Sequence, residues 1–211
     1  MGNWNLRKFK ALCLNRGLDR LWFYTESLAF KYNAALYHKD IIERKMQNVK
    51  DKGMKLPPEK IAALDLEIAF EFDALMLTLN STWDILGQLL NERFIRPKID
   101  TTCVSFDRVS DPTKAHRQSI PPEIQSLLDS IRGNCLYSMI KDYVNVSKHR
   151  YAIKGEIEVD FGETPTRVSY KTQEFEYKRG QRRRLTPDKA FKCLEFVGKS
   201  VDQVGAEVQK E

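Results

Sequence analysis

The feature that most constrains the fold is a stretch from Glu59 to about Phe94 that contains no proline and a single glycine, Gly87. Proline and glycine are the residues least favourable inside a helix, so a segment almost free of both can continue as one helix. Its apolar residues recur every three or four positions, the spacing of one helical face: Ile61, Leu64, Ile68, Phe72, Leu75, Leu79, Trp83, Leu86 and Leu90. Such a helix would be about 54 Å long. The sequence therefore predicts a mainly α-helical protein.

A second helix is predicted directly before this one, from Glu26 to Lys52, because apolar and aromatic residues again recur at helical spacing. The connection from Gly53 to Pro58 is short. Helices joined by so few residues usually pack antiparallel. We therefore expect a long helical hairpin within an antiparallel helical bundle.

The rest of the chain is predicted to hold a loop, two shorter helices, a small β-hairpin or meander, and a last helix. The loop is indicated by its prolines and short polar residues, and the strands by alternation of apolar and charged residues. The predicted ranges are Arg96 to Ile120 for the loop, Glu123 to Ser130 and Cys135 to His149 for the helices, Ile153 to Phe161, Thr166 to Tyr170 and Glu174 to Tyr177 for the strands, and Thr186 onwards for the last helix.

Length and composition are those of one globular domain. The 211 residues are 42% hydrophobic and 30% charged, which favours a single domain over residues 1–211 with a β insertion at about 153–178. No apolar run approaches the length of a membrane helix, and the first residues lack an apolar signal core, so we expect a cytoplasmic protein. The four cysteines are far apart and are expected to be free thiols.

The charge balance and the missing motifs narrow the function. A formal net charge of +6 permits a nucleic-acid or acidic-protein partner without demanding one. The sequence contains no P-loop, no dinucleotide-binding glycine pattern and no nucleophile elbow, so those enzyme classes lack support. It also has no Glu-x-x-His pair of the kind that binds two metal ions. No metal and no cofactor are expected.

One helical face carries a candidate site. Ser138, Asp142, Asn145 and His149 share a face of the predicted 135–149 helix, because positions seven and eleven apart nearly eclipse. Histidine can act as a general acid or base near neutral pH, and the asparagine can hold the ring or donate to a phosphate oxygen. A simpler interpretation is that basic residues at a helix end, here Lys148, His149 and Arg150, complement the helix dipole at the surface.

The densest basic run in the chain is expected on the turn before the last helix. It consists of Lys178, Arg179, Arg182, Arg183 and Arg184. The run could grip phosphate groups, or it could be a solvated cluster of charges. Few aromatic residues interleave with it, apart from Phe175 and Tyr177, so the sequence favours neither interpretation.

The segment from Asp142 to Arg150 resembles the helix that carries the hallmark motif of the HEPN superfamily. Asn145 and His149 match that motif's polar residue and histidine, and the Asn-x-x-Lys-His pattern is similar to a bacterial subgroup of HEPN-like proteins. The segments Phe70–Ala74 and Ser81–Gln88 also look like the partner helix of that subgroup. The resemblance departs from the family at Val144, which stands where the family carries its catalytic arginine.

This resemblance implies a four- or five-helix bundle, commonly dimeric, from a superfamily with many metal-independent ribonucleases in toxin–antitoxin, antiviral or RNA-processing systems. We expect a homodimeric module that presents Asn145, His149 and basic surface to RNA, a nucleotide or a protein partner, with a degenerate catalytic motif. One alternative is an active metal-independent endoribonuclease in which His149 works with Lys148, Arg150 or the basic run. The other is a scaffolding protein whose long hairpin mediates assembly.

Overall fold

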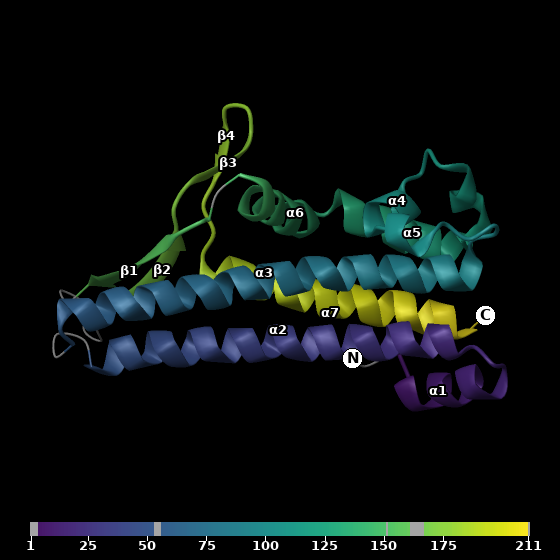
Figure 1. Cartoon of the computed structure of the whole chain (residues 1–211), viewed down its shortest axis with the longest axis horizontal. Helices are drawn as coiled ribbons and strands as arrows, with labels where there is room; N and C mark the ends of the chain where they lie inside the picture. The colour runs from purple at the N-terminus through teal and green to yellow at the C-terminus, as the bar shows by residue number, and fades with distance from the viewer. Residues whose placement is uncertain (1–3, 53–55, 151, 161–166, 211) are drawn as a thin grey trace. The chain divides into compact units, whose positions relative to one another are not determined.

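The computed structural model describes residues 4–52, 56–150, 152–160 and 167–210. Within these ranges the protein is mainly α-helical, with seven α-helices and two small β-hairpins before the last helix (Figure 1). Gly53, at the start of the predicted connection, and the predicted strand residues Phe161 and Thr166 lie outside the described residues. Each described helix is too short or too polar to cross a lipid bilayer.

The helices in chain order are α1 Leu6–Asn15, α2 Asp19–Lys52, α3 Pro58–Phe94, α4 Phe106–Ser110, α5 Pro122–Gly133, α6 Cys135–His149 and α7 Pro187–Lys210. Two 3₁₀ turns, η2 Thr101–Cys103 and η3 Ala115–Ser119, flank α4. The strands are β1 Gly155–Asp160, β2 Arg167–Thr172, β3 Phe175–Lys178 and β4 Gln181–Arg183. The long α2–α3 hairpin and the bounds of α6 are confirmed.

Three details of the prediction are corrected. A first helix, α1, was not predicted, and α2 begins at Asp19 rather than Glu26. Gly17 separates these two helices with a φ of +64°, a conformation that glycine adopts without strain. The predicted loop from Arg96 to Ile120 contains α4 and both 3₁₀ turns. Short helices of this kind are held by capping contacts rather than by a long apolar stripe, so periodicity does not reveal them.

The described chain forms two compact units, and α2, α3, α6 and α7 each contribute residues to both. The first unit contains the described residues of 1–33, 79–138 and 195–211. Its core is built around Trp83, whose ring packs against Phe106, Tyr137 and Phe196 at centroid distances of 5.2 to 5.7 Å. This aromatic cluster ties α4 and α6 to the long helix α3.

The second unit contains residues 34–78 and 139–194. Strands β1 and β2 pair antiparallel, and β3 pairs antiparallel with β4. The ring of Phe72 on α3 packs against Tyr143 on α6 and Tyr170 on β2, each at 5.8 Å between centroids. A Cβ atom at Gly155 would lie 2.0 Å from the Tyr170 hydroxyl, so this close approach of β1 requires glycine.

Acidic residues on α3 contact basic residues of α2 in this second unit. Glu67 pairs with Lys45 of α2, and the Glu71 carboxylate lies 2.7 Å from Nδ1 of His38. These contacts join the two arms of the hairpin across its surface. The first contact is an ion pair and the second a hydrogen bond of the imidazole, and their part-exposed positions limit their contribution to stability.

Candidate functional site

The second half of α6 presents Asn145 and His149 to solvent. Both side chains are exposed and lie one helical turn apart, whereas Tyr143, Val144 and Val146 on the opposite side are buried. The predicted polar face is thus confirmed for these two residues. Neither side chain has a hydrogen-bond partner within the described chain, so both remain available to a ligand.

Contacts with α3 fix the rotation of α6. The Ser147 hydroxyl donates a 2.6 Å hydrogen bond to the carboxylate of Asp73. Burial raises the pKa of the Tyr143 phenol far above its usual range, and the nearby Asp73 carboxylate raises it further. Tyr143 therefore remains a neutral donor toward this carboxylate. The buried polar anchor on one side of α6 keeps Asn145 and His149 on the other.

The basic run forms a β-hairpin and not only a turn. Lys178 ends β3 and Arg183 ends β4, while Gly180 turns the chain with a φ of +73°. The Gly180 amide donates a 2.8 Å hydrogen bond to the Glu176 side chain, which closes the tip. The strand predicted at Glu174 to Tyr177 corresponds to β3, whereas the polar and charged residues of β4 lack the apolar alternation that would have predicted a strand.

This hairpin is docked against α6 by two polar contacts. Nη1 of Arg183 lies 2.9 Å from Oδ2 of Asp142, and its guanidinium stacks over the Tyr177 ring at 4.3 Å. Nη1 of Arg150 donates a 2.6 Å hydrogen bond to the backbone oxygen of Glu176. The two candidate features of the sequence, far apart along the chain, are therefore brought together in one unit (Figure 1).

Electrostatics follow from this docking. Burial raises the pKa of Asp142, and the positive charges of Arg183, Lys178 and Lys141 oppose that rise. The half-buried pair of Asp142 and Arg183 is thus occupied by its own contact, so these two predicted binding residues have a positioning role. The predicted binding residues that remain exposed are Lys148, Arg150, Lys178, Arg179, Arg182 and Arg184.

Positive charge is concentrated here. Residues 141–150 and 174–184 together contain eight basic and three acidic residues, a net of +5, compared with +6 for the whole chain. Within the described residues, the exposed Arg182 makes a loose contact with Glu174 at 3.9 Å, and the exposed Arg184 interacts electrostatically with Glu158. Such a surface attracts polyanions.

Val144 packs inside the second unit and is only 3% exposed. An arginine at this position would have its guanidinium directed into the core rather than toward His149. The position at which the resembled family has its arginine is therefore part of a packing face of α6. A metal-free nuclease site built in the usual way of the resembled family lacks its main cation here.

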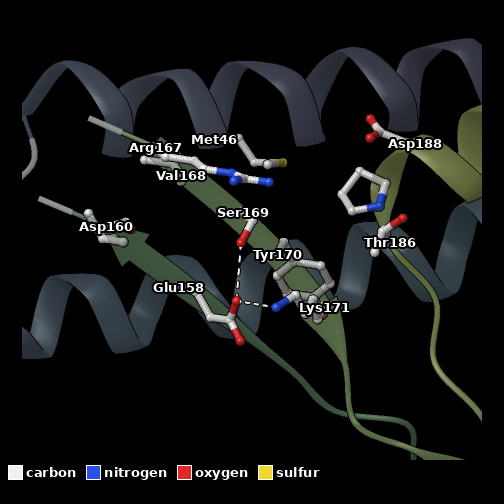
Figure 2. A pocket seen from close by; sticks show the side chains of 12 residues that line it. Met46, Glu158, Asp160, Arg167, Val168, Ser169, Tyr170, Lys171, Thr186 and Asp188 are labelled. Carbon is white, nitrogen blue, oxygen red and sulfur yellow. Dashed lines mark hydrogen bonds and ion pairs between the residues drawn. The ribbon is translucent and has the colours of Figure 1, made fainter. Parts of the chain in front are cut away.

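A separate cavity of about 590 Å³ lies beside β1 and β2, bordered by Met46 of α2 and Asp188 at the start of α7 (Figure 2). Its charges largely satisfy one another. Glu158 accepts a 3.3 Å hydrogen bond from Ser169 and pairs with Lys171, as Figure 2 shows. No residue of the α6 site lines this cavity. Its mixed lining gives it no strong preference for an anion.

The chain matches no protein-family model, no curated protein and no solved structure.

Proposed function

We propose that this protein is a HEPN-like module that binds RNA through a basic surface made by the end of α6 and the β3–β4 hairpin. The basic surface is defined by exposed cations: Lys148, Arg150, Lys178, Arg179, Arg182 and Arg184. A role in bacterial defence or a toxin–antitoxin system follows only from the family resemblance.

The observation that carries this proposal is the ion pair between Arg183 and Asp142. It uses one arginine of the run to hold the hairpin beside α6, and the other basic side chains of the run are exposed and can contact phosphates. A solvated cluster of charges would need no such anchor. Lysine and arginine side chains arranged along a surface supply the sequence-independent part of nucleic-acid affinity.

Asn145 and His149 would lie next to the bound RNA backbone or a base. An amide and an imidazole can each donate and accept hydrogen bonds, which suits recognition of phosphates and base edges. Because Val144 occupies a packing position, we propose binding without cleavage as the main activity.

The test is fluorescence anisotropy with a labelled single-stranded RNA of about 20 nucleotides at 50 mM salt. The triple variant Lys178→Gln, Arg179→Gln and Arg184→Gln should weaken binding at least tenfold, because each lost phosphate contact removes counterion release. The matched control replaces exposed lysines of α7, Lys189, Lys192 and Lys199, with glutamine.

The control protein should bind RNA as the unmodified protein does. Absence of RNA binding by the unmodified protein at low salt would overturn the proposal. Equal loss in the control would show that affinity follows total charge and not this surface.

Exposed aromatic residues on α2 favour self-association of this protein in addition to RNA binding. Phe23 and Phe30 are 64% and 71% exposed, and their spacing of seven residues places them on one side of the helix. Large exposed aromatics at a heptad spacing are typical of a helix that pairs with another helix. The next position in the series is also an exposed aromatic, Tyr37.

We propose a second copy of this chain as the occupant, because the flanking charges of α2 complement themselves. Glu26 and Lys31 lie on either side of Phe30 and are five residues apart. This is the offset at which two parallel helices exchange ion pairs. Light scattering should show a dimer that Phe30→Glu converts to a monomer. Leu14→Glu, at an exposed apolar residue of α1, is the control and should leave the dimer intact. A monomeric unmodified protein would contradict this arrangement.

A further inference from the structure

The first unit contains a cationic cavity that the proposed RNA surface does not use. It has a volume of about 440 Å³ and lies between the α1–α2 turn and the end of α3. Four basic residues line it, Arg20, Arg93, Arg96 and Lys98, together with the acidic residues Asp19 and Glu92. All of these residues belong to the first unit.

The contacts inside the cavity leave positive charge in excess. Glu92 is paired with Lys98 and is thereby neutralised. Nη1 of Arg96 donates to the backbone oxygens of Glu92, at 3.2 Å, and Ile95, at 2.6 Å. These two bonds orient the guanidinium and leave its remaining N–H groups for a ligand.

Two further arginines have no carboxylate partner within the described residues. The Arg20 side chain is exposed and makes no hydrogen bond or ion pair there. Arg93 is half-buried, and its guanidinium carbon lies 5.7 Å from the centroid of the Phe94 ring. Glu92 is paired with Lys98, which leaves three arginines and one acidic residue, Asp19. The lining is therefore net positive.

The shape and chemistry of the lining indicate the ligand. Guanidinium groups match the oxygens of a phosphate group with paired N–H donors, and several of them can surround one dianion. The volume is within the usual range for small-molecule sites and exceeds what one phosphate group needs. Leu18 and Leu21 add apolar wall, which suits an organic part attached to the phosphate.

We infer that this cavity binds the phosphate end of a small organic phosphate, with Arg20, Arg93 and Arg96 as the binding residues. The inference does not depend on the RNA-binding surface, because the two sites share no residue. Ligand binding here is a property of the first unit.

Isothermal titration calorimetry with the full chain tests the inference, with adenosine 5′-diphosphate, pyrophosphate and inorganic phosphate as separate probes. The diphosphate nucleotide should bind more tightly than pyrophosphate, because only the nucleotide contacts the leucines. Arg20→Gln should weaken nucleotide binding about tenfold or more, the usual effect of losing a charge-assisted hydrogen bond. Arg7→Gln, at an exposed arginine of α1 outside the cavity, is the matched control and should bind as the unmodified protein does.

Three results would overturn the inference: no heat with any probe at millimolar concentration, equal affinity for pyrophosphate and the nucleotide, or unchanged binding in Arg20→Gln. Arg93→Gln is a second variant should Arg20→Gln misfold, and circular dichroism identifies misfolding. RNA binding by Arg20→Gln should equal that of the unmodified protein, whereas the triple variant of the basic surface should retain nucleotide binding. These reciprocal results separate failure of one site from failure of the other.

Discussion

The guanidinium of Arg183 lies 2.9 Å from the carboxylate of Asp142, and this contact joins the β3–β4 hairpin to α6. The two side chains are 25% and 17% exposed, between the values of a surface pair and a buried one. Asp142→Ala should therefore destabilise hairpin docking by about 1–2 kcal/mol. Hydrogen exchange of residues 175–183 should accelerate.

The control for this prediction is Glu174→Ala, because Glu174 contacts Arg182 at 3.9 Å and both side chains are more than half exposed. Exchange in that variant should be unchanged. Unchanged exchange in Asp142→Ala as well would show that the ion pair does not hold the hairpin.

The salt dependence of RNA binding should report the number of cations at the interface. Each phosphate contact on a single strand contributes about −0.7 to the slope of log affinity against log salt. Removing Lys178, Arg179 and Arg184 should therefore make the slope shallower by about 2. An unchanged slope with lower affinity would indicate misfolding rather than lost contacts.

Neighbouring residues on α6 should respond in opposite ways to arginine. Val144→Arg places a guanidinium in the core and should cost about 3 kcal/mol or more. Asn145→Arg lies on the exposed face and should leave the melting temperature nearly unchanged. Chemical denaturation of both variants measures the difference. A tolerated Val144→Arg that gained nuclease activity would refute the packing role of this position.

Ribonuclease activity is the alternative that His149 keeps open. We expect no cleavage of RNA in the presence of a metal chelator, because Val144, which stands where the resembled family has its arginine, is buried. Gel analysis of RNA incubated with the unmodified protein and with His149→Ala measures this. Cleavage by the unmodified protein that disappears in the variant would establish the enzymatic alternative.

The stability of the second unit should increase when Asp65 is neutralised. Burial raises the pKa of Asp65, Glu156 raises it further, and an amide hydrogen bond from Ile157 only partly opposes this. A raised pKa in the folded state means that the stabilising contribution is present below the ordinary value of about 3.8 and is lost as pH rises. Asp65→Asn should therefore raise the melting temperature at pH 7.

At pH 3 the same variant should differ little from the unmodified protein, since Asp65 is then protonated in both states. Asp40→Asn is the control: Asp40 is exposed on α2, and its replacement should have little effect at either pH. A lower melting temperature for Asp65→Asn at pH 7 would contradict the desolvation argument.

Periodicity was sufficient for the long elements. The stripe from Ile61 to Leu90 predicts α3, and the 135–149 pattern predicts α6 with its observed bounds, because side chains three and four apart share a helical face. Periodicity did not predict the elements that depend on single contacts. Helix α4 depends on caps, with the Ser105 hydroxyl accepting from the Arg108 amide, and the strand β4 consists of one polar and two charged residues.

Local sequence alone determined the helical class, the hairpin and the shared face of Asn145 and His149, since these follow from helical periodicity, whereas contacts with α3 turn that face to solvent. Tertiary structure decided what surrounds them. Asp142 and Arg183 are 41 positions apart in the chain, and no local pattern couples an acid on a helix to a particular arginine in a basic run. The burial of Val144 was likewise decided by packing in the second unit, because a helix has more than one side that apolar residues can occupy.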